Sequence, residues 1–341
     1  MKKIRTEDAV GHVLCHDITR IIKDVVKDTP FRKGHIVTQE DIPVLLSLGK
    51  THLYVWENDD TKYHENEAAE ILCQICKNDY MTASPVREGK IELSADCDGL
   101  FTVDVERLNA INSLDEIMIA TRHNHFPVHK GDKLLGTRVI PLVIDKSRME
   151  EAKKIGGDTP ITRLYPYLPM KCGIVTTGSE VYYGRIQDTF TPVIQKKMAE
   201  YGICISGHIT VDDTMEKITN AIFQLKAQGA DMIVCTGGMS VDPDDMTPGA
   251  IKATGAKIIT YGAPVLPGAM FLLAYMSDGT PVMGLPGCVM YSKATVFDLV
   301  MSRIAAGIPV SRKDIVALGC GGFCLGCDTC HYPACSFGKG V

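Results

Sequence analysis

The sequence predicts an α/β protein whose mostly parallel sheet is covered by helices on both faces. Short apolar runs alternate with helix-like segments between residues 171 and 307, a pattern typical of parallel strands joined by crossover helices. Turns rich in glycine or hydroxyl groups follow three of the apolar runs. With 341 residues the chain is also too long for one ordinary core, which indicates two or three folded units.

The predicted elements of this region follow one another as strand, helix, strand, helix, strand. They lie at residues 172–176, 189–201, 203–209, 214–228 and 232–235, and are followed by strands at 257–260 and 282–284 and a helix at 290–306. Ligands of such folds bind beyond the carboxyl ends of the strands. We therefore expect the turns after the strands to converge on one edge of the sheet.

The first 170 residues are predicted to be β-rich, with several short strands and one helix. The strand-like runs lie at residues 36–37, 52–55, 102–105 and 138–144, and the helix at 66–77. Segment 155–160 is small and polar and ends in proline, so it is the best linker candidate. We expect three parts: a β-rich N-terminal region at 1–155, an α/β domain at 165–310 and a cysteine-rich tail at 311–341.

Composition excludes several classes of function. The formal net charge of −5 and the lack of a basic stripe argue against nucleic acid as a partner. The most apolar stretch, at residues 270–276, is far too short to span a membrane, and no apolar signal segment follows the charged start. Thirteen cysteines, unevenly spread, fit a reducing compartment better than a disulfide scaffold. We expect a cytoplasmic protein.

The segment from Thr236 to Thr247 combines a strand end, two glycines and three carboxylates. Gly237 and Gly238 can expose backbone N–H groups to an anion, because no Cβ stands in the way. Three carboxylates would repel that anion unless they held a hard cation. They are Asp242, Asp244 and Asp245, and they predict an anionic ligand bound with Mg²⁺. The alternative is a solvated acidic loop with a helix cap at Thr247, in which case Pro248 would be the first residue of the helix.

Seven short motifs occur in the order found in the molybdopterin-binding domain of molybdenum-cofactor biosynthesis proteins, which residues 170–307 therefore resemble. They are Thr177-Gly178-Ser179-Glu180, Gly184-x-x-x-Asp188-Thr189, Val211-Asp212-Asp213, Thr236-Gly237-Gly238-Met239-Ser240, Asp245-x-Thr247, Pro267-Gly268 and Gly284-Leu285-Pro286-Gly287. The resemblance implies a three-layer α/β sandwich that binds the phosphate-bearing pterin dithiolene called molybdopterin.

The resemblance also implies which residues contact the ligand. We expect the molybdopterin site to be lined by Thr177, Gly178, Ser179, Glu180, Thr236, Gly237, Gly238, Ser240, Thr247, Pro286, Gly287 and Cys288. Asp188 and Asp245 are the expected catalytic residues, serving the metal and the phosphate. For Asp188 the alternative is a carboxylate that caps a helix, and for residues 177–180 it is an ordinary strand-to-helix connection.

A second resemblance narrows the subgroup. Segment 120–132 and the run Thr137-Arg138-Val139-Ile140-Pro141 are similar to the region that precedes the binding domain in molybdotransferase-like proteins. The Met-Asp-Gly-Tyr-Ala signature of that subgroup is missing, however, and its Gly-Leu-Pro-Gly-Asn-Pro motif here continues from Gly287 with Cys288 and Val289. Binding is therefore better supported than catalysis.

The resemblance leaves three functions open, one of which is an adenylyltransferase, because the same domain serves both steps in the family. The first of the other two is a molybdotransferase-like enzyme that takes molybdopterin or adenylylated molybdopterin together with molybdate and helps to insert molybdenum. The second is a non-catalytic carrier or redox-responsive sensor of the finished cofactor, with a molybdoenzyme or another protein of the cofactor pathway as its partner. In each case the expected assembly is a homo-oligomer.

The cysteines near the end of the chain suggest chemistry of their own. Cys288 follows Gly287 at a helix start, where a lowered pKa would make its thiol a soft ligand, although small buried cysteines are also common in cores. In the tail, Cys324, Cys327, Cys330 and Cys335 have the spacing of an iron–sulfur or zinc site, and Cys320 is an alternative fourth ligand. A polar connection at residues 311–314 precedes the tail, so we expect a metal bound by the tail to be energetically separate from the core of the α/β domain.

Overall fold

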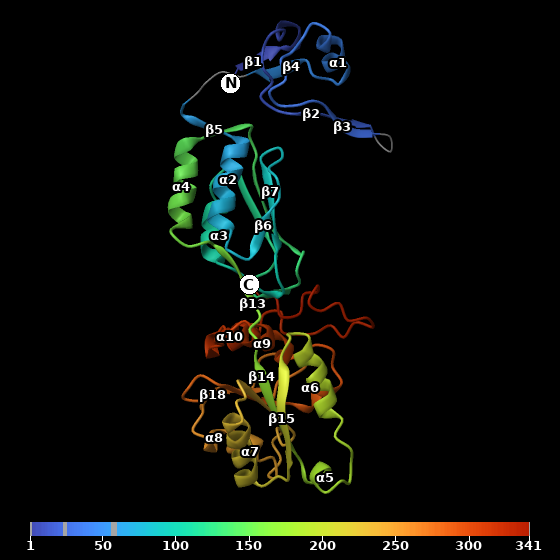
Figure 1. Cartoon of the computed structure of the whole chain (residues 1–341), viewed down its shortest axis with the longest axis vertical. Coiled ribbons are helices and arrows are strands. Elements are labelled where there is room, and N and C mark those ends of the chain that lie inside the picture. Colours follow the sequence, from blue (N-terminus) through green and yellow to red (C-terminus); the bar gives the residue numbers. More distant parts are fainter. Residues whose placement is uncertain (1, 23–25, 56–59, 341) are drawn as a thin grey trace. The chain divides into compact units, whose positions relative to one another are not determined.

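A computed structural model of the chain describes residues 2–22, 26–55 and 60–340, and these residues form two compact units. One unit comprises Met1–Ser94, Val103–Arg122 and Asp132–Arg163. The other comprises Ala95–Thr102, His123–Gly131 and Leu164–Val341, so two short segments of the N-terminal half belong to the C-terminal unit. Figure 1 draws the whole chain, coloured from blue at the N-terminus to red at the C-terminus. Among the described residues, no helix is long and apolar enough to cross a membrane.

The C-terminal unit is built on a six-stranded sheet with strand order β15-β14-β16-β19-β18-β17. The strands are β14 (Lys171–Thr177), β15 (Cys204–Val211), β16 (Met232–Thr236), β17 (Lys257–Tyr261), β18 (Leu272–Tyr275) and β19 (Pro281–Leu285). The pairs β14–β15, β14–β16 and β16–β19 are parallel, whereas β18 pairs antiparallel with both of its neighbours. The sheet is therefore mostly parallel, as the sequence predicts.

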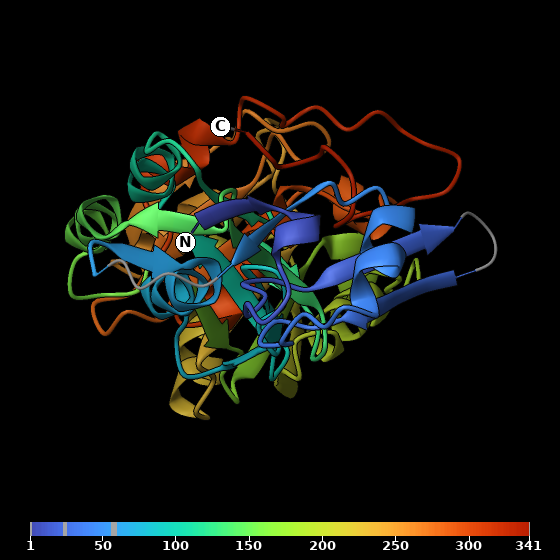
Figure 2. The same cartoon turned by 90° about the horizontal axis from the view of Figure 1, so that it is seen from above.

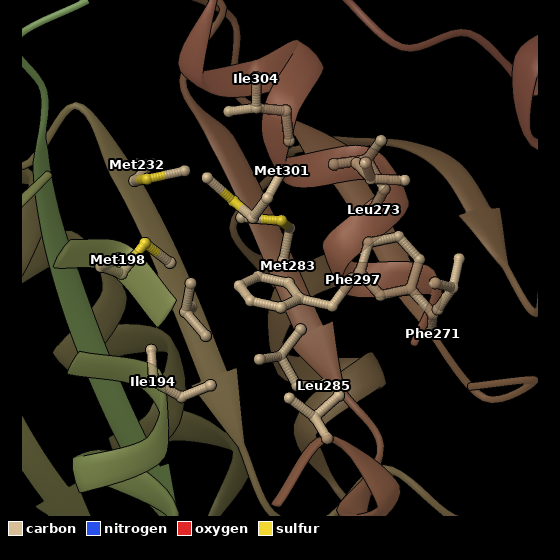
Figure 3. Close-up of a cluster of buried hydrophobic side chains, with 14 of the residues drawn as sticks. Ile194, Met198, Met232, Phe271, Leu273, Met283, Leu285, Phe297, Met301 and Ile304 are labelled. Carbon is tan, nitrogen blue, oxygen red and sulfur yellow. The ribbon is translucent and has the colours of Figure 1, made fainter. Parts of the chain in front are cut away.

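Helices cover both faces of this sheet. On one face α7 (Met215–Ala227) and α8 (Thr247–Ala253) pack against a core that includes Ile222 and Ile233. On the other face α6 (Phe190–Ala199), the 3-10 helix η2 (Gly287–Met290) and α9 (Val296–Ala305) enclose a second core. Figure 3 shows Met232 and Met283 of the sheet facing Phe297 and Met301 of α9 in that second core. The unit is a three-layer α/β sandwich.

In this unit one strand was not predicted, and one predicted helix differs from the observed structure. The sequence analysis treated residues 270–276 as an apolar stretch too short to span a membrane and predicted no strand there. Leu272–Tyr275 forms β18 in the interior of the sheet, which explains its apolar composition. The single helix predicted at 290–306 is instead η2 followed by α9, because Thr295 caps a new helix through the Phe297 N–H at 3.2 Å.

The N-terminal unit combines helices with short strands. Its four-stranded sheet has the order β6-β7-β11-β9. These strands are β6 (Met81–Ala83), β7 (Lys90–Ala95), β9 (Ile117–Thr121) and β11 (Lys133–Val139). Strands β1 (Lys2–Arg5) and β4 (His52–Val55) pair with each other, as do β2 (Ile18–Ile22) with β3 (Val26–Phe31) and β5 (Lys62–His64) with β12 (Val143–Asp145).

The helix predicted at residues 66–77 is α2 (Glu65–Cys76), in which Cys73 and Cys76 are buried. The described residues hold further helices that the sequence analysis missed: α1 (Asp41–Ser47), α3 (Val105–Asn112) and α4 (Lys146–Gly156). Helix α4 also takes up the start of the expected linker. A further sheet of order β10-β8-β13 is formed by β8 (Gly99–Val103), β10 (Phe126–Val128) and β13 (Thr162–Pro166).

The C-terminal tail is irregular but packed. Helix α10 (Arg312–Ala317) precedes it, and residues 318–340 contain no helix or strand; the tail is the red loop of Figure 2. Phe337 is 3% exposed and lies in the core shared with α9. Leu266 donates its N–H to the Gly322 carbonyl at 2.8 Å and accepts from the Cys324 N–H at 2.9 Å. The tail therefore packs against the sandwich core.

Candidate functional site

The carboxyl ends of four neighbouring strands lie side by side at one edge of the sheet. Thr176 of β14 is in register with Thr210 of β15 and with Thr236 of β16, and Thr236 is in register with Leu285 of β19. The turns that follow these strands therefore begin at the same level of the sheet. This confirms that the glycine- and hydroxyl-rich turns converge on one edge.

The turn after β16 needs glycine at both of its first positions. Gly237 has φ +87°, and a Cβ there would lie 2.2 Å from the Thr177 carbonyl oxygen. Gly238 has φ +55°, and its Cβ would lie 2.9 Å from Thr247 Oγ1 and 3.2 Å from Thr177 Oγ1. Side chains are strained at such φ values and cannot fit in this space. The two glycines allow the turns after β14 and β16 to touch.

Two threonine hydroxyls lie against this turn. Thr177 Oγ1 and Thr247 Oγ1 are 3.2 Å apart, and the Thr247 hydroxyl donates to the Gly237 carbonyl at 2.9 Å. Within the described part of the chain, neither the Gly238 nor the Met239 N–H donates to another protein atom. The Thr247 proton is thus committed to the Gly237 carbonyl and the Thr177 hydroxyl donates to Thr247. The free backbone N–H groups are the donors that can bind an oxyanion. The expected helix cap by Thr247 is wrong, because α8 begins at this residue with no side-chain cap.

Asp188 is held by a set of hydrogen bonds beside the strand ends. Its carboxylate accepts from the backbone N–H groups of Phe190 and Thr191 at 2.8 and 3.0 Å, and from the Thr191 hydroxyl at 2.6 Å. The Thr176 hydroxyl donates to it at 3.2 Å. Although burial alone would raise its pKa, these hydrogen bonds from Thr191, Phe190 and Thr176 leave the pKa of Asp188 below its ordinary value.

His208 is a member of this cluster that the sequence analysis missed. Its Nε2 lies 2.9 Å from Thr176 Oγ1 and 3.6 Å from Asp188 Oδ2. The signal was the position of His208 next to the end of a predicted strand, where side chains reach the ligand-binding edge. Asp188 therefore lies between a helix start and an imidazole, and it serves both as a helix cap and as part of the strand-end cluster.

The three carboxylates after the glycine turn lie in an irregular loop. Asp242 and Asp244 are exposed and Asp245 is half-buried, and the Asp245 N–H donates to the Asp242 carbonyl at 3.0 Å. Ser240 is exposed, and its carbonyl accepts from the Tyr261 hydroxyl at 3.3 Å. Over residues 2–22, 26–55 and 60–340, no three His, Cys, Asp or Glu side chains are grouped so that they could hold one metal ion. The predicted Mg²⁺ site stays a prediction.

The turn after β14 is tied to the turn after β15. Gly178 has φ +134°, and the Ser179 N–H donates to Asp213 Oδ2 at 2.8 Å. Asp212 instead pairs with Lys217 at 2.6 Å. Glu180 is exposed. Of the expected ligand residues in this turn, Ser179 has its backbone engaged within the protein, and Glu180 extends toward solvent.

Cys288 corrects one expectation. It lies in η2, directly after Pro286 and Gly287 at the end of β19. Burial raises the pKa of its thiol, so the lowered pKa expected at this helix start is wrong. The reason is that η2 spans only Gly287–Met290, so few aligned backbone N–H groups offset the loss of solvation.

The tail cysteines gather around one cavity. Cys324, Cys327, Cys330 and Cys335 line a cavity of about 260 Å³ between the tail and the segment Ser292–Ala294. Cys320 does not line it, although it was an alternative fourth ligand. The four cysteines that the spacing selects thus line the same cavity, although among the described residues no three of them are placed to share one metal ion.

Comparison with known proteins identifies the domain. Residues 173–306 match the family described as a probable molybdopterin binding domain, and residues 3–57 match a domain of unknown function. A CinA-like protein of Shewanella sp. (strain MR-4) is 38% identical over 91 residues, which are 26% of this chain and 21% of that protein. The nicotinamide-nucleotide amidohydrolase PncC of Shewanella oneidensis is 37% identical over 91 residues, also 21% of its length. The chain thus spans about a fifth of the length of these curated relatives.

Solved structures with a similar fold include the molybdopterin biosynthesis enzyme MoaB of Thermus thermophilus. It is 19% identical and covers 41% of this chain and 98% of its own, with a TM-score of 0.33. The protein CinA of Thermoplasma acidophilum is 20% identical and covers 40% of this chain and 98% of its own, also with a TM-score of 0.33. On the match of residues 173–306, the α/β sandwich of this chain belongs to the molybdopterin-binding domain family.

Proposed function

We propose that this protein binds molybdopterin through its terminal phosphate at the Gly237–Gly238 turn and assists the insertion of molybdenum during cofactor biosynthesis. The observation that carries the proposal is the turn itself, which lies at the end of the central strand β16 with the hydroxyls of Thr177 and Thr247 against it. These hydroxyls hold the turn in place, and within the described residues the free N–H groups of Gly238 and Met239 supply the donors. A phosphate oxygen accepts from such donors without help from a basic side chain.

The carboxylates of the site would serve a cation. Asp245, Asp242 and Asp244 follow the phosphate turn, and oxygen ligands with several waters suit Mg²⁺. If the protein is an enzyme, its reaction hydrolyses adenylylated molybdopterin and inserts molybdenum from molybdate, which is a substrate. Asp188, whose charge the surrounding hydrogen bonds stabilise, would then face the pterin or the metal.

A titration tests the binding proposal. Anaerobic protein is titrated with molybdopterin and, separately, with nicotinamide mononucleotide, because one relative carries the name of a nicotinamide-nucleotide amidohydrolase. Both ligands bear a phosphate, so a preference reports on the rest of the molecule. We expect molybdopterin to bind at least tenfold more tightly. Tighter binding of the mononucleotide would contradict the proposal.

A cofactor carrier without catalytic activity is the second candidate. The specific observation in its favour is that, among the described residues, Asp242, Asp244 and Asp245 are not grouped around one point. The enzyme would hydrolyse adenylylated molybdopterin repeatedly, whereas the carrier would only bind the pterin. Adenylylated molybdopterin, molybdate and Mg²⁺ are mixed with the protein, and released AMP is measured. Catalytic release, lost in Asp245→Asn, supports the enzyme, whereas tight binding without AMP supports the carrier.

A further inference from the structure

The cavity of the C-terminal tail has the residues of a soft-metal site. Among the described residues that line it, four are cysteines and none carries a carboxylate. Lys293 and His331 also line it, and both can offset or share the charge of thiolates. Thiolate sulfur selects zinc, copper(I) or iron–sulfur clusters over hard cations such as Mg²⁺. The tail site is therefore chemically distinct from the carboxylate loop that follows β16.

Spacing and volume together distinguish a cluster from a single ion. Cys324, Cys327 and Cys330 follow one another at intervals of three residues, as in the cysteine runs that hold iron–sulfur clusters. A zinc ion draws its four ligands to about 2.3 Å and leaves no space between them. Here the four cysteines line a cavity of about 260 Å³, and within the described residues no three of them are placed to share one ion. A cluster of several metal and sulfur atoms fits this arrangement better than a single zinc ion does.

The tail is anchored so that the cavity persists without regular secondary structure. Phe337 is buried in the sandwich core, and its ring packs edge-on against Tyr332 with 6.3 Å between centroids. The Tyr332 hydroxyl donates to the Asp298 carbonyl at 3.2 Å. Cys324 is fixed at the other end by its N–H bond to Leu266. Between these anchors, Cys327 and Cys330 are exposed.

From these observations we propose that the tail binds an iron–sulfur cluster through Cys324, Cys327, Cys330 and Cys335. The anchors hold the first and last of these ligands, since Cys324 and Cys335 both pack against the sandwich core. The two exposed thiols close the site when the cluster is bound. This site is independent of the molybdopterin site, because its ligands all lie in the tail.

The full chain is purified anaerobically, reconstituted with ferrous iron and sulfide, and desalted. Iron, sulfide and zinc are then quantified and the visible spectrum is recorded. We expect about four iron and four sulfide per chain, the content of a [4Fe–4S] cluster, and a brown chromophore that bleaches with dithionite. The double variant Cys324→Ser, Cys327→Ser and the single variant Cys335→Ser should lose most of the iron and the chromophore.

Cys320→Ser is the matched control, because Cys320 is an exposed tail cysteine outside the cavity. It should keep the wild-type iron content, and circular dichroism should show that all variants remain folded. A colourless protein with one zinc per chain, or a reconstituted protein without iron, would overturn the proposal. So would equal loss of iron in Cys320→Ser and Cys335→Ser. Molybdopterin binding should be unchanged in every variant.

Discussion

Hydrogen bonds around Asp188 link three adjacent strands to the start of a helix. Thr176 of β14 contacts Asp188, His208 of β15 and, at 3.4 Å, the hydroxyl of Thr236 of β16. Such a network fixes the orientation of each side chain, because the Thr176 hydroxyl has more than one partner. The strand-end edge is therefore rigid on the side of β14 and β15.

Gly237→Ala tests the close approach of the two turns. The added Cβ would collide with the Thr177 carbonyl, so we expect a loss of about 2–3 kcal/mol in the free energy of unfolding. Gly229 is a matched control, since it has the same φ of +87° but no atom within 4 Å of the added Cβ. Gly229→Ala should cost only about 1 kcal/mol. Urea unfolding of both variants measures the difference, and equal losses would contradict the packing argument.

Asp188→Asn should destabilise the protein in a pH-dependent way. At neutral pH we expect a loss of about 1–3 kcal/mol, because charge-assisted hydrogen bonds are replaced by weaker ones. The pKa of Asp188 lies below its ordinary value of 3.8, so its charge stabilises the fold above that value. This stabilisation is lost as the pH falls through the lowered pKa. The gap between wild type and variant should therefore narrow below about pH 4.

Urea unfolding at pH 7 and near pH 3 gives the comparison for Asp188. The control is Asp244→Asn, which changes an exposed carboxylate in the irregular loop. This variant should lie within about 0.5 kcal/mol of the wild type at neutral pH. A difference for Asp188→Asn that stays constant, or grows, as the pH is lowered would show that the charge of Asp188 does not stabilise the fold.

At the scale of elements, the start of α9 is fixed by a buried ion pair. Asp298 and Lys197 of α6 are 8% and 10% exposed in their side chains. Asp298 also accepts from the Thr295 N–H at 2.7 Å, which completes the cap of α9. One carboxylate thus joins two helices on the same face of the sheet and sets where α9 begins.

Removing one partner of this pair should cost more than removing both. Asp298→Ala leaves the Lys197 ammonium buried without its counter-charge, and we expect a loss of about 3–5 kcal/mol. The double variant Lys197→Met, Asp298→Ala should recover part of this loss and retain the cost of the missing cap, about 1 kcal/mol. Thermal and urea unfolding measure both. A double variant no more stable than Asp298→Ala would contradict the account.

Helices and strands whose apolar residues recur with a clear period were predictable from the sequence. Five observed elements lie within two residues of their predicted bounds: strands β14, β15 and β16 and helices α6 and α7. Each has a long apolar run or a continuous apolar helical face, which gives a clear signal in the sequence. Short elements such as α1 and α3 were missed. Seven or eight residues give only two turns of helix, and their burial depends on neighbours distant in the sequence.

The site was predictable in outline rather than in its contacts. Gly237 was identified because a glycine pair directly after a strand can expose backbone N–H groups. Asp188 was identified because it stands in one of the motifs that carry the family resemblance. His208 was missed because strand pairing, not spacing, brings it to Asp188. The raised pKa of Cys288 depends on burial by the finished fold. Nor does any local pattern indicate that Phe337, so near the end of the chain, enters the core of the sandwich.

At the scale of the whole C-terminal unit, the tail should contribute to the stability of the sandwich. Phe337→Ala removes a buried ring from the core, and we expect a loss of about 3–5 kcal/mol. Phe323→Ala is the matched control, because this tail ring is 67% exposed. It should change stability by less than about 0.5 kcal/mol. Calorimetry of both variants decides, and similar melting temperatures would mean that the tail unfolds on its own.

The central claim is that the turn after β16 binds the phosphate of molybdopterin. Its most direct measurement is an anaerobic titration of wild type, Gly229→Ala and Gly237→Ala with molybdopterin and with its dephosphorylated form. We expect wild type and Gly229→Ala to bind molybdopterin at least tenfold more tightly than the dephosphorylated pterin. Gly237→Ala, although still folded by circular dichroism, should bind the two equally weakly. Equal affinity of the wild type for both pterins, or a phosphate preference retained in Gly237→Ala, would contradict the claim.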